Sequence, residues 1–135
     1  MPRDARHNRQ IFRYLFSTDM GREMISKALV AASTKPVILS ILAGGERYGY
    51  QIIQHVIEIS DGTLEWSEGM LYPVLHRMEK DGLIQSQWRI SENGRKRKYY
   101  NLTDLGKTEL AKEKTEWTKV NSLLSRLWNP LAIPD

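Results

Sequence analysis

The 135-residue chain contains no cysteine, which excludes disulfide bonds, thiolate metal sites and cysteine nucleophiles. It also lacks any apolar run that approaches the roughly 18 residues a membrane-spanning helix needs. The apolar stretch from Ile11 to Phe16 is interrupted by Arg13 and is too short for a secretion signal. We therefore expect a protein of the reducing cytoplasm, with no cofactor and no bound metal.

Motifs of enzymes are equally scarce. The histidines His7, His55 and His76 do not have the spacing of a metal site. Gly44 and Gly45 lack the Gly-Lys-Ser/Thr ending of a phosphate-binding loop, and their place after an expected helix favours a turn. Since no nucleophile with a base and no paired carboxylates occur at a recognisable spacing, the sequence argues against an enzyme.

The excess of positive charge is concentrated at one place in the chain. The net charge of +4 results from 20 Lys and Arg against 16 Asp and Glu. The consecutive residues Arg95, Lys96, Arg97 and Lys98 account for all of this excess. Such a basic cluster predicts a polyanionic partner such as DNA, although a charge run can also be only a solvated surface.

The first part of the chain favours helix. Residues 1–34 have helical spacing of apolar side chains and are expected to form an N-terminal extension, whose role the sequence does not assign. Thr34 followed by Pro36 resembles the start of a helix, because proline is tolerated in a first turn. A short buried helix from Val37 to Leu42 is expected to follow.

Two amphipathic helices are expected next. One begins near Tyr48 and ends at Asp61-Gly62, where the glycine breaks the pattern. The other begins after Ser67, a typical N-cap residue, and ends before Gly82. Together with the preceding helix they form a run of three short helices.

The helix after Ser67 has one apolar and one polar face. Its inner stripe at helical spacing consists of Leu71, Val74, Leu75 and Met78. Its polar side chains are Tyr72, His76, Arg77 and Lys80, beside Pro73, which is expected to bend the start of the helix. Hydrogen bonds from these side chains to phosphates or base edges, and an apolar contact from Met70 to a thymine methyl group, are the interactions this face would offer DNA.

A change of periodicity to two predicts a β-hairpin after the third helix. Residues Ile84–Ile90 alternate between apolar or small and polar side chains, and Lys96–Leu102 returns as the partner strand. Asn93-Gly94 is the preferred pair for a two-residue hairpin turn. The basic cluster should then lie at the tip of the hairpin and project away from the core.

The last helix is long and carries an apolar stripe. Thr103 with Asp104 caps its start. The stripe, interrupted by Glu113, is formed by Leu110, Trp117, Val120, Leu124 and Leu127. Because the preceding elements already supply a small closed core, this stripe has no expected partner within the chain and predicts self-association.

The order of these elements predicts a mainly α fold with a small β-hairpin, a winged helix-turn-helix with a C-terminal dimerisation helix. The expected parts are an N-terminal helical extension (1–34), the winged helix-turn-helix domain (35–102), the dimerisation helix (103–128) and a tail (129–135). In such a fold the third helix enters the major groove and the hairpin, or wing, reaches the neighbouring backbone or minor groove.

Two other uses of this fold compete with DNA binding. A winged helix used only for protein contacts would more often carry an apolar or acidic wing than four adjacent cations. RNA binding is disfavoured because the sequence shows no aromatic stacking platform on a sheet. The basic wing therefore favours double-stranded DNA as the partner.

Three stretches of the sequence resemble the PadR family of bacterial regulators. They are Tyr48–Ile52, Glu68–Ile84 and Gly94–Gly106, and the resemblance extends over about residues 35–128. It implies a homodimer that binds DNA through the third helix and the wing, that usually represses transcription, and that is released by a signal such as a small aromatic compound. The short C-terminal region resembles the subgroup with a single C-terminal helix.

These considerations define the candidate site residues. For DNA binding they are Met70, Tyr72, Pro73, His76, Arg77, Lys80, Arg95, Lys96, Arg97 and Lys98. For the dimer interface they are Trp117, Val120, Leu124 and Leu127. Tyr72 can instead pack against a neighbouring helix, and His76 can simply face solvent. In some short members of the family that the chain resembles, a tryptophan at the position of Trp117 lies between the subunits and stacks on flat aromatic ligands.

Overall fold

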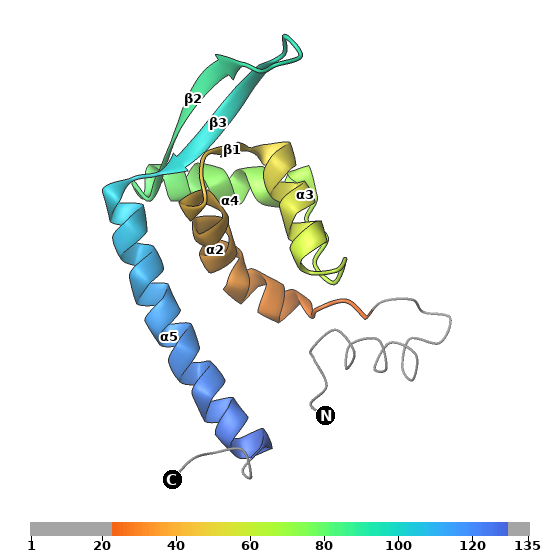
Figure 1. Ribbon diagram of the computed structural model, residues 1–135, viewed down its shortest axis with the longest axis vertical. Coiled ribbons are helices and arrows are strands. Elements are labelled where there is room, and N and C mark those ends of the chain that lie inside the picture. The colour runs from red at the N-terminus through yellow and green to blue at the C-terminus, as the bar shows by residue number, and fades with distance from the viewer. Residues whose placement is uncertain (1–22, 130–135) are drawn as a thin grey trace, which may run out of the picture.

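The computed structural model describes residues 23–129, in which four helices and a three-stranded sheet follow one another (Figure 1). In chain order the elements are α2 (Lys27–Ala43), β1 (Arg47–Tyr48), α3 (Gly49–Ile59), α4 (Glu68–Lys80), β2 (Ile84–Ile90), β3 (Lys96–Leu102) and α5 (Asp104–Trp128). This arrangement confirms the predicted winged helix-turn-helix with a long C-terminal helix. The predictions for residues 1–22, including the stretch Ile11–Phe16, and for most of the tail lie outside the described residues.

The first described helix begins earlier than the sequence predicts. α2 starts at Lys27, and the side chain of Ser26 caps it. Thr34 lies inside this helix and donates a hydrogen bond from Oγ1 to the carbonyl oxygen of Val30 at 2.6 Å. The predicted start at Thr34 is therefore wrong, because a threonine hydroxyl can bind a helix carbonyl one turn back as well as cap a helix. Pro36 is also inside α2, and the division placed after residue 34 falls within the helix.

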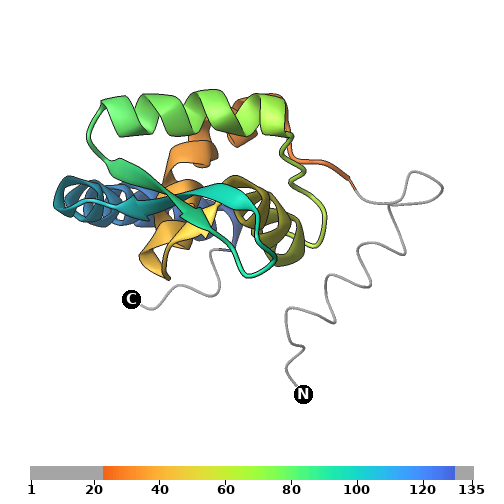
Figure 2. The same cartoon turned by 90° about the horizontal axis from the view of Figure 1, so that it is seen from above.

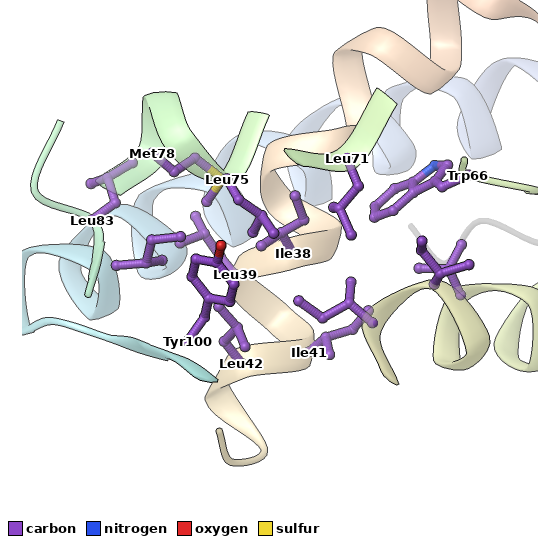
Figure 3. Packing of buried hydrophobic residues seen from close by; sticks show 14 of the residues in the cluster. Ile38, Leu39, Ile41, Leu42, Trp66, Leu71, Leu75, Met78, Leu83 and Tyr100 are labelled. Carbon is purple, nitrogen blue, oxygen red and sulfur yellow. The ribbon is translucent and has the colours of Figure 1, made fainter. Parts of the chain in front are cut away.

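The hydrophobic core lies where α2, α3 and α4 meet the sheet (Figure 3). The largest completely buried side chains are Ile38, Leu39, Ile52, Val56, Leu71, Leu75 and Ile84. Each such burial stabilises the fold by about 2 kcal/mol. Since α2, α3, α4 and β2 all contribute, the orientation of α4 is fixed by the same core that holds the domain together.

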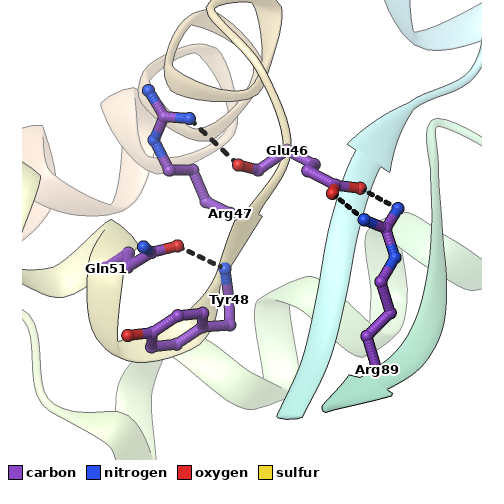
Figure 4. A network of polar contacts seen from close by, with 5 residues as sticks. All are labelled: Glu46, Arg47, Tyr48, Gln51 and Arg89. Atoms are coloured by element: carbon purple, nitrogen blue, oxygen red, sulfur yellow. Dashed lines mark hydrogen bonds and ion pairs between the residues drawn. The ribbon is translucent and has the colours of Figure 1, made fainter. Parts of the chain in front are cut away.

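A very short strand extends the predicted hairpin into a three-stranded antiparallel sheet of order β1-β3-β2. In it Arg47 pairs with Tyr100, and Tyr48 pairs with Tyr99. Glu46, next to β1, binds Arg89 of β2 through both carboxylate oxygens (Figure 4). The sequence analysis missed β1 because two residues are too few to show an alternating pattern.

The strands of the wing, defined here as β2, β3 and the loop between them, have the predicted bounds, but the turn differs. Ser91 N donates to the carbonyl oxygen of Arg95 at 2.7 Å, so the loop spans three residues rather than two. Gly94 has a φ of 81°, whereas Asn93 does not have a positive φ. A two-residue turn of the predicted type needs positive φ at both positions. The Asn93 side chain instead accepts a hydrogen bond from Arg95 N.

The start of α5 is fixed to the turn that follows α4. Thr103 caps the helix by accepting a hydrogen bond from Gly106 N at 3.0 Å, and its hydroxyl donates to the carbonyl oxygen of Gly82 at 2.5 Å. At Gly106 a side chain would overlap the carbonyl oxygen of Leu83, so only glycine allows this close approach. Leu110 is buried in the core, which corrects its assignment to an unpartnered stripe.

An ion pair joins α5 to α2 one turn further along. Lys35 Nζ lies 2.7 Å from Glu109 Oε2 and 3.6 Å from Glu113 Oε1. The hydrogen bond to Lys35 lowers the pKa of Glu109, and the same bond raises the pKa of Lys35. Both groups therefore stay charged around neutral pH.

None of the helices within residues 23–129 is long and apolar enough to cross a membrane.

Candidate nucleic-acid interface

The outer face of α4 carries the polar side chains predicted for DNA recognition. Its inner face is buried through Leu71, Leu75 and Met78, with Val74 half-buried beside them. The side chains exposed on the opposite face are Tyr72, Pro73, His76, Arg77 and Lys80. Figure 2 shows α4 along the outer edge of the domain, with the wing beside it. The helix is thus free to enter a groove of DNA along its whole length.

Met70 does not lie with this group. Its side chain is half-buried and packs against the hydrophobic core. It lines a cavity along one flank of α4, together with Val74 and with Pro73 and Arg77 of the exposed face. Position 70 is one helical turn before Val74 and borders the apolar stripe, so the structure offers packing rather than a thymine contact for this side chain.

The position of Tyr72 is compatible with both interpretations that the sequence left open. Its ring packs on Gly49 at the start of α3, where a side chain would overlap the phenol. The residue nevertheless remains 41% exposed at the edge of α4 that faces the wing. Burial, followed by the nearby Glu68 carboxylate, raises the pKa of Tyr72, so its hydroxyl stays protonated. Held in this way, it can donate a hydrogen bond to a phosphate oxygen.

The basic cluster of the wing divides into two exposed and two half-buried residues. Arg95 and Lys96 are exposed. The Arg97 guanidinium lies over the ring of Tyr48, 4.3 Å from its centre, and Lys98 Nζ lies 3.8 Å from Glu79 Oε1. The prediction that all four project away from the core is therefore wrong for Arg97 and Lys98, because aromatic faces and a carboxylate of the domain attract them.

The side of the wing near α4 also carries aromatic side chains that the sequence analysis did not assign to the site. A hollow of roughly 420 Å³ separates the wing from the starts of α3 and α4. Tyr50, Trp88 and Tyr100 line it together with the cations of β3. Burial raises the pKa of Tyr100 to about 12, so its phenol remains neutral. The hollow thus presents the cations of β3 and the neutral phenol of Tyr100, which can bind phosphate oxygens, together with the carboxylate of Glu68.

Trp88 is exposed because the wing extends beyond the core (Figure 1). Along β2, Ile84 is buried and Ser86 is half-buried, whereas Trp88 and Ile90 are exposed. Alternation along the sequence correctly predicts a strand, but it does not show where the underlying core ends. The outer half of the hairpin therefore stands free to contact a partner.

The described part of the chain leaves the apolar stripe of α5 uncovered beyond its first turns. Trp117 is 38% exposed, Val120 48% and Leu127 67%, and Leu124 is half-buried. Trp117 borders an apolar groove of roughly 360 Å³ between α2 and α5.

Within residues 23–129, no group of three or more His, Asp or Glu side chains could hold a metal ion.

Comparison with known proteins identifies relatives of this domain. Residues 38–112 match the transcriptional regulator PadR-like family. The chain is 36% identical to a transcriptional regulator of Mycobacterium tuberculosis over 83 residues, which cover 62% of this chain and 74% of that protein. It is 31% identical to an uncharacterised protein of Lysinibacillus sphaericus over 101 residues, or 75% of this chain and 93% of that one. A PadR-like transcriptional regulator of Bacillus cereus has a similar structure, with a TM-score of 0.69 and 32% identity over 76% of this chain and 98% of that chain.

The exposed half of the basic cluster generates a prediction about salt. Replacing both Arg95 and Lys96 with alanine should weaken binding to every duplex. The slope of the logarithm of the binding constant against the logarithm of the salt concentration should become less steep by up to about two per wing, because each lost phosphate contact means about one fewer counterion released. Titrations of labelled duplex at several salt concentrations measure this slope. The matched control, Lys112→Ala with Lys119→Ala, removes the same charge from exposed positions of α5 and should leave the slope nearly unchanged. Equal slopes for the wild type and the wing variant would remove the wing from the interface.

Proposed function

The chain belongs to the PadR-like family of transcriptional regulators, and from this membership we propose that it is a dimeric repressor that reads its operator with α4 and the wing of both subunits. As a member of this family the protein is a DNA-binding regulator rather than an enzyme. Its site of action would be the cytoplasm, where bacterial DNA lies. Recognition of an operator, formation of a homodimer and release by a ligand are the parts of this function that we propose.

The observation that carries the proposal is that one domain presents an exposed polar face on α4 and exposed cations, Arg95 and Lys96, on the wing that starts four residues after α4 ends. Arg77, His76 and Lys80 can reach base edges or phosphates from a helix in the major groove. Arg95 and Lys96 would then meet the neighbouring sugar-phosphate backbone. The helix supplies sequence preference, and the wing supplies affinity that depends on salt.

The apolar stripe of α5 supports the proposed homodimer. A second copy of this helix would cover Trp117, Val120, Leu124 and Leu127, which the described part of one chain leaves exposed or half-buried. Two-fold symmetry pairs the same stripe of both subunits. A dimer that reads one face of the duplex then requires half-sites about 34 Å apart, which is one turn of DNA.

Release by a flat aromatic ligand is the proposed control of repression. Trp117 borders the groove between α2 and α5 and presents part of its ring. A planar aromatic molecule can stack on such a ring between two subunits. Use of the fold only for protein contacts is not favoured, because the chain belongs to a family of transcriptional regulators and the exposed Trp88 and Ile90 of the wing lie beside the cation Lys96.

Reading of bases by α4 is tested at Arg77. Arg77→Ala should reduce the preference for the operator over a scrambled duplex by about five- to 150-fold, the range expected for one specific base contact worth about 1–3 kcal/mol. Competition titrations with the two duplexes measure this ratio. Lys96→Ala serves as the control, since a phosphate contact should weaken both duplexes equally. A ratio unchanged by Arg77→Ala would remove this side chain from base recognition.

The dimer interface is tested at Trp117. Trp117→Ala should weaken association by on the order of 3 kcal/mol, because it removes a large apolar side chain from a buried seam. Sedimentation equilibrium over a range of protein concentrations measures the change. Trp88→Ala, which removes the same side chain from the exposed wing, should leave the dimer intact. An undisturbed dimer in the Trp117 variant contradicts the proposed interface.

A further inference from the structure

The carboxylate of Glu79 joins α4 to both strands of the wing. Its Oε2 accepts a hydrogen bond from Ser86 Oγ of β2 at 2.5 Å, and its Oε1 lies 3.8 Å from Lys98 Nζ of β3. Glu79 itself is half-buried, on the flank of α4 between the buried stripe and the exposed polar face. One acidic side chain thus contacts both the wing and one of its four cations.

The sheet face that turns toward α4 brings these groups together. Ser86 pairs with Tyr100, and Lys98 precedes Tyr100 by two residues on β3, so their side chains share one face of the sheet. The burial of Tyr100 identifies this face as the one that packs on the core. On α4, Glu79 lies seven residues after Tyr72, on the same side of the helix. The carboxylate therefore lies where α4 and the wing meet.

Lys98 is held inward by two groups. Besides its ion pair with Glu79, its Nζ lies over the ring of Tyr100, 5.8 Å from the ring centre. A carboxylate and the face of an aromatic ring both attract a cation. The Lys98 side chain is nevertheless 37% exposed, so a competing anion can reach the ammonium group. Arg95 and Lys96, by contrast, are exposed on the outer part of the wing.

The ion pair changes what Lys98 can contribute to DNA binding. A cation raises the affinity for DNA by neutralising a phosphate and releasing a counterion from the duplex. To make such a contact, Lys98 must leave Glu79, and the carboxylate that remains then repels the phosphates. The gain from the phosphate contact is therefore offset by the loss of the ion pair.

We propose that Glu79 is a positioning residue that holds Lys98 against α4 and withholds this cation from the phosphates of DNA. The inference rests on the proposed DNA interface, in which Arg95 and Lys96 supply the phosphate contacts of the wing. Because phosphate contacts act on every duplex, Glu79 lowers the part of the affinity that does not depend on sequence. The base contacts of α4 are left unchanged.

The experiment neutralises Glu79 and measures the response to salt. Glu79→Gln keeps the length of the side chain and an oxygen for Ser86 but removes the charge. Titration of the full chain against a labelled scrambled duplex should show an affinity about two- to fivefold higher at low salt, the effect of one exposed charge pair. The slope of the logarithm of the binding constant against the logarithm of the salt concentration should become steeper by up to about one per wing. A purely structural role would instead weaken binding, and that result overturns the proposal.

Two further variants separate the ion pair from the general field of the protein. Asp81→Asn removes the same charge from an exposed position two residues further along and should leave the slope nearly unchanged. Lys98→Gln should flatten the slope by about one per wing in Glu79→Gln protein and by much less in otherwise wild-type protein. A slope that steepens equally in Asp81→Asn overturns the proposal. Flattening by about one per wing in Lys98→Gln alone also overturns it, and this result requires no variant of Glu79.

The failure of this inference differs from the failure of the proposed function. Wild-type protein that binds duplex DNA, with the same slope in Glu79→Gln, contradicts the role of Glu79 alone. Wild-type protein that binds neither a promoter duplex nor a scrambled duplex at low salt contradicts the proposed DNA interface, and the role of Glu79 with it.

Discussion

The burial of Leu71, Leu75 and Met78 is the constraint on which the outward face of the domain depends. These side chains hold one side of α4 against the core formed by α2, α3 and β2. Helical geometry then directs Tyr72, His76 and Lys80 outward, and packing on Gly49 holds the Tyr72 ring at the edge of the helix. The same burial sets the position of the wing, because β2 begins only four residues after α4 ends and Ile84 enters the same core.

A second connection joins α4 to the helix proposed to form the dimer. Thr103 and Gly106 hold the start of α5 against the turn at Gly82-Leu83, and Lys35 binds Glu109 one turn further on. Because the turn at residue 82 ends α4, the direction of α5 is fixed relative to that of α4. In a dimer built on α5, the spacing of the two α4 helices would follow from this junction and would match a fixed spacing of half-sites.

The sequence predicts the elements that long periodic patterns specify. The apolar stripe and the Ser67 cap predict α4 almost to the residue, and alternation with its matching return predicts β2 and β3. The errors occur where one residue type has two local uses. Thr34 can cap a helix or bind a carbonyl within it, and Asn93 can occupy a two-residue turn or bind the backbone beside a longer one.

The exposed face of α4 was predicted correctly because polarity and helical spacing distinguish it from the buried stripe. Contacts between distant segments could not be predicted in this way. Arg97 lies on Tyr48, almost fifty positions away in the chain, and Met70 turns toward a cavity that three separate segments form. The contacts of Glu79 with both strands of the wing are likewise invisible in a sequence, since they depend on how the fold places the sheet beside α4.

The most direct test of the account is fluorescence anisotropy of a labelled duplex from the promoter upstream of this protein's own gene, titrated at two salt concentrations beside a scrambled duplex. The account predicts tighter binding to the promoter than to the scrambled sequence, with both affinities reduced by salt. Equal binding to the two duplexes would contradict recognition of this promoter by α4, and no binding at low salt would contradict a DNA interface formed by α4 and the wing.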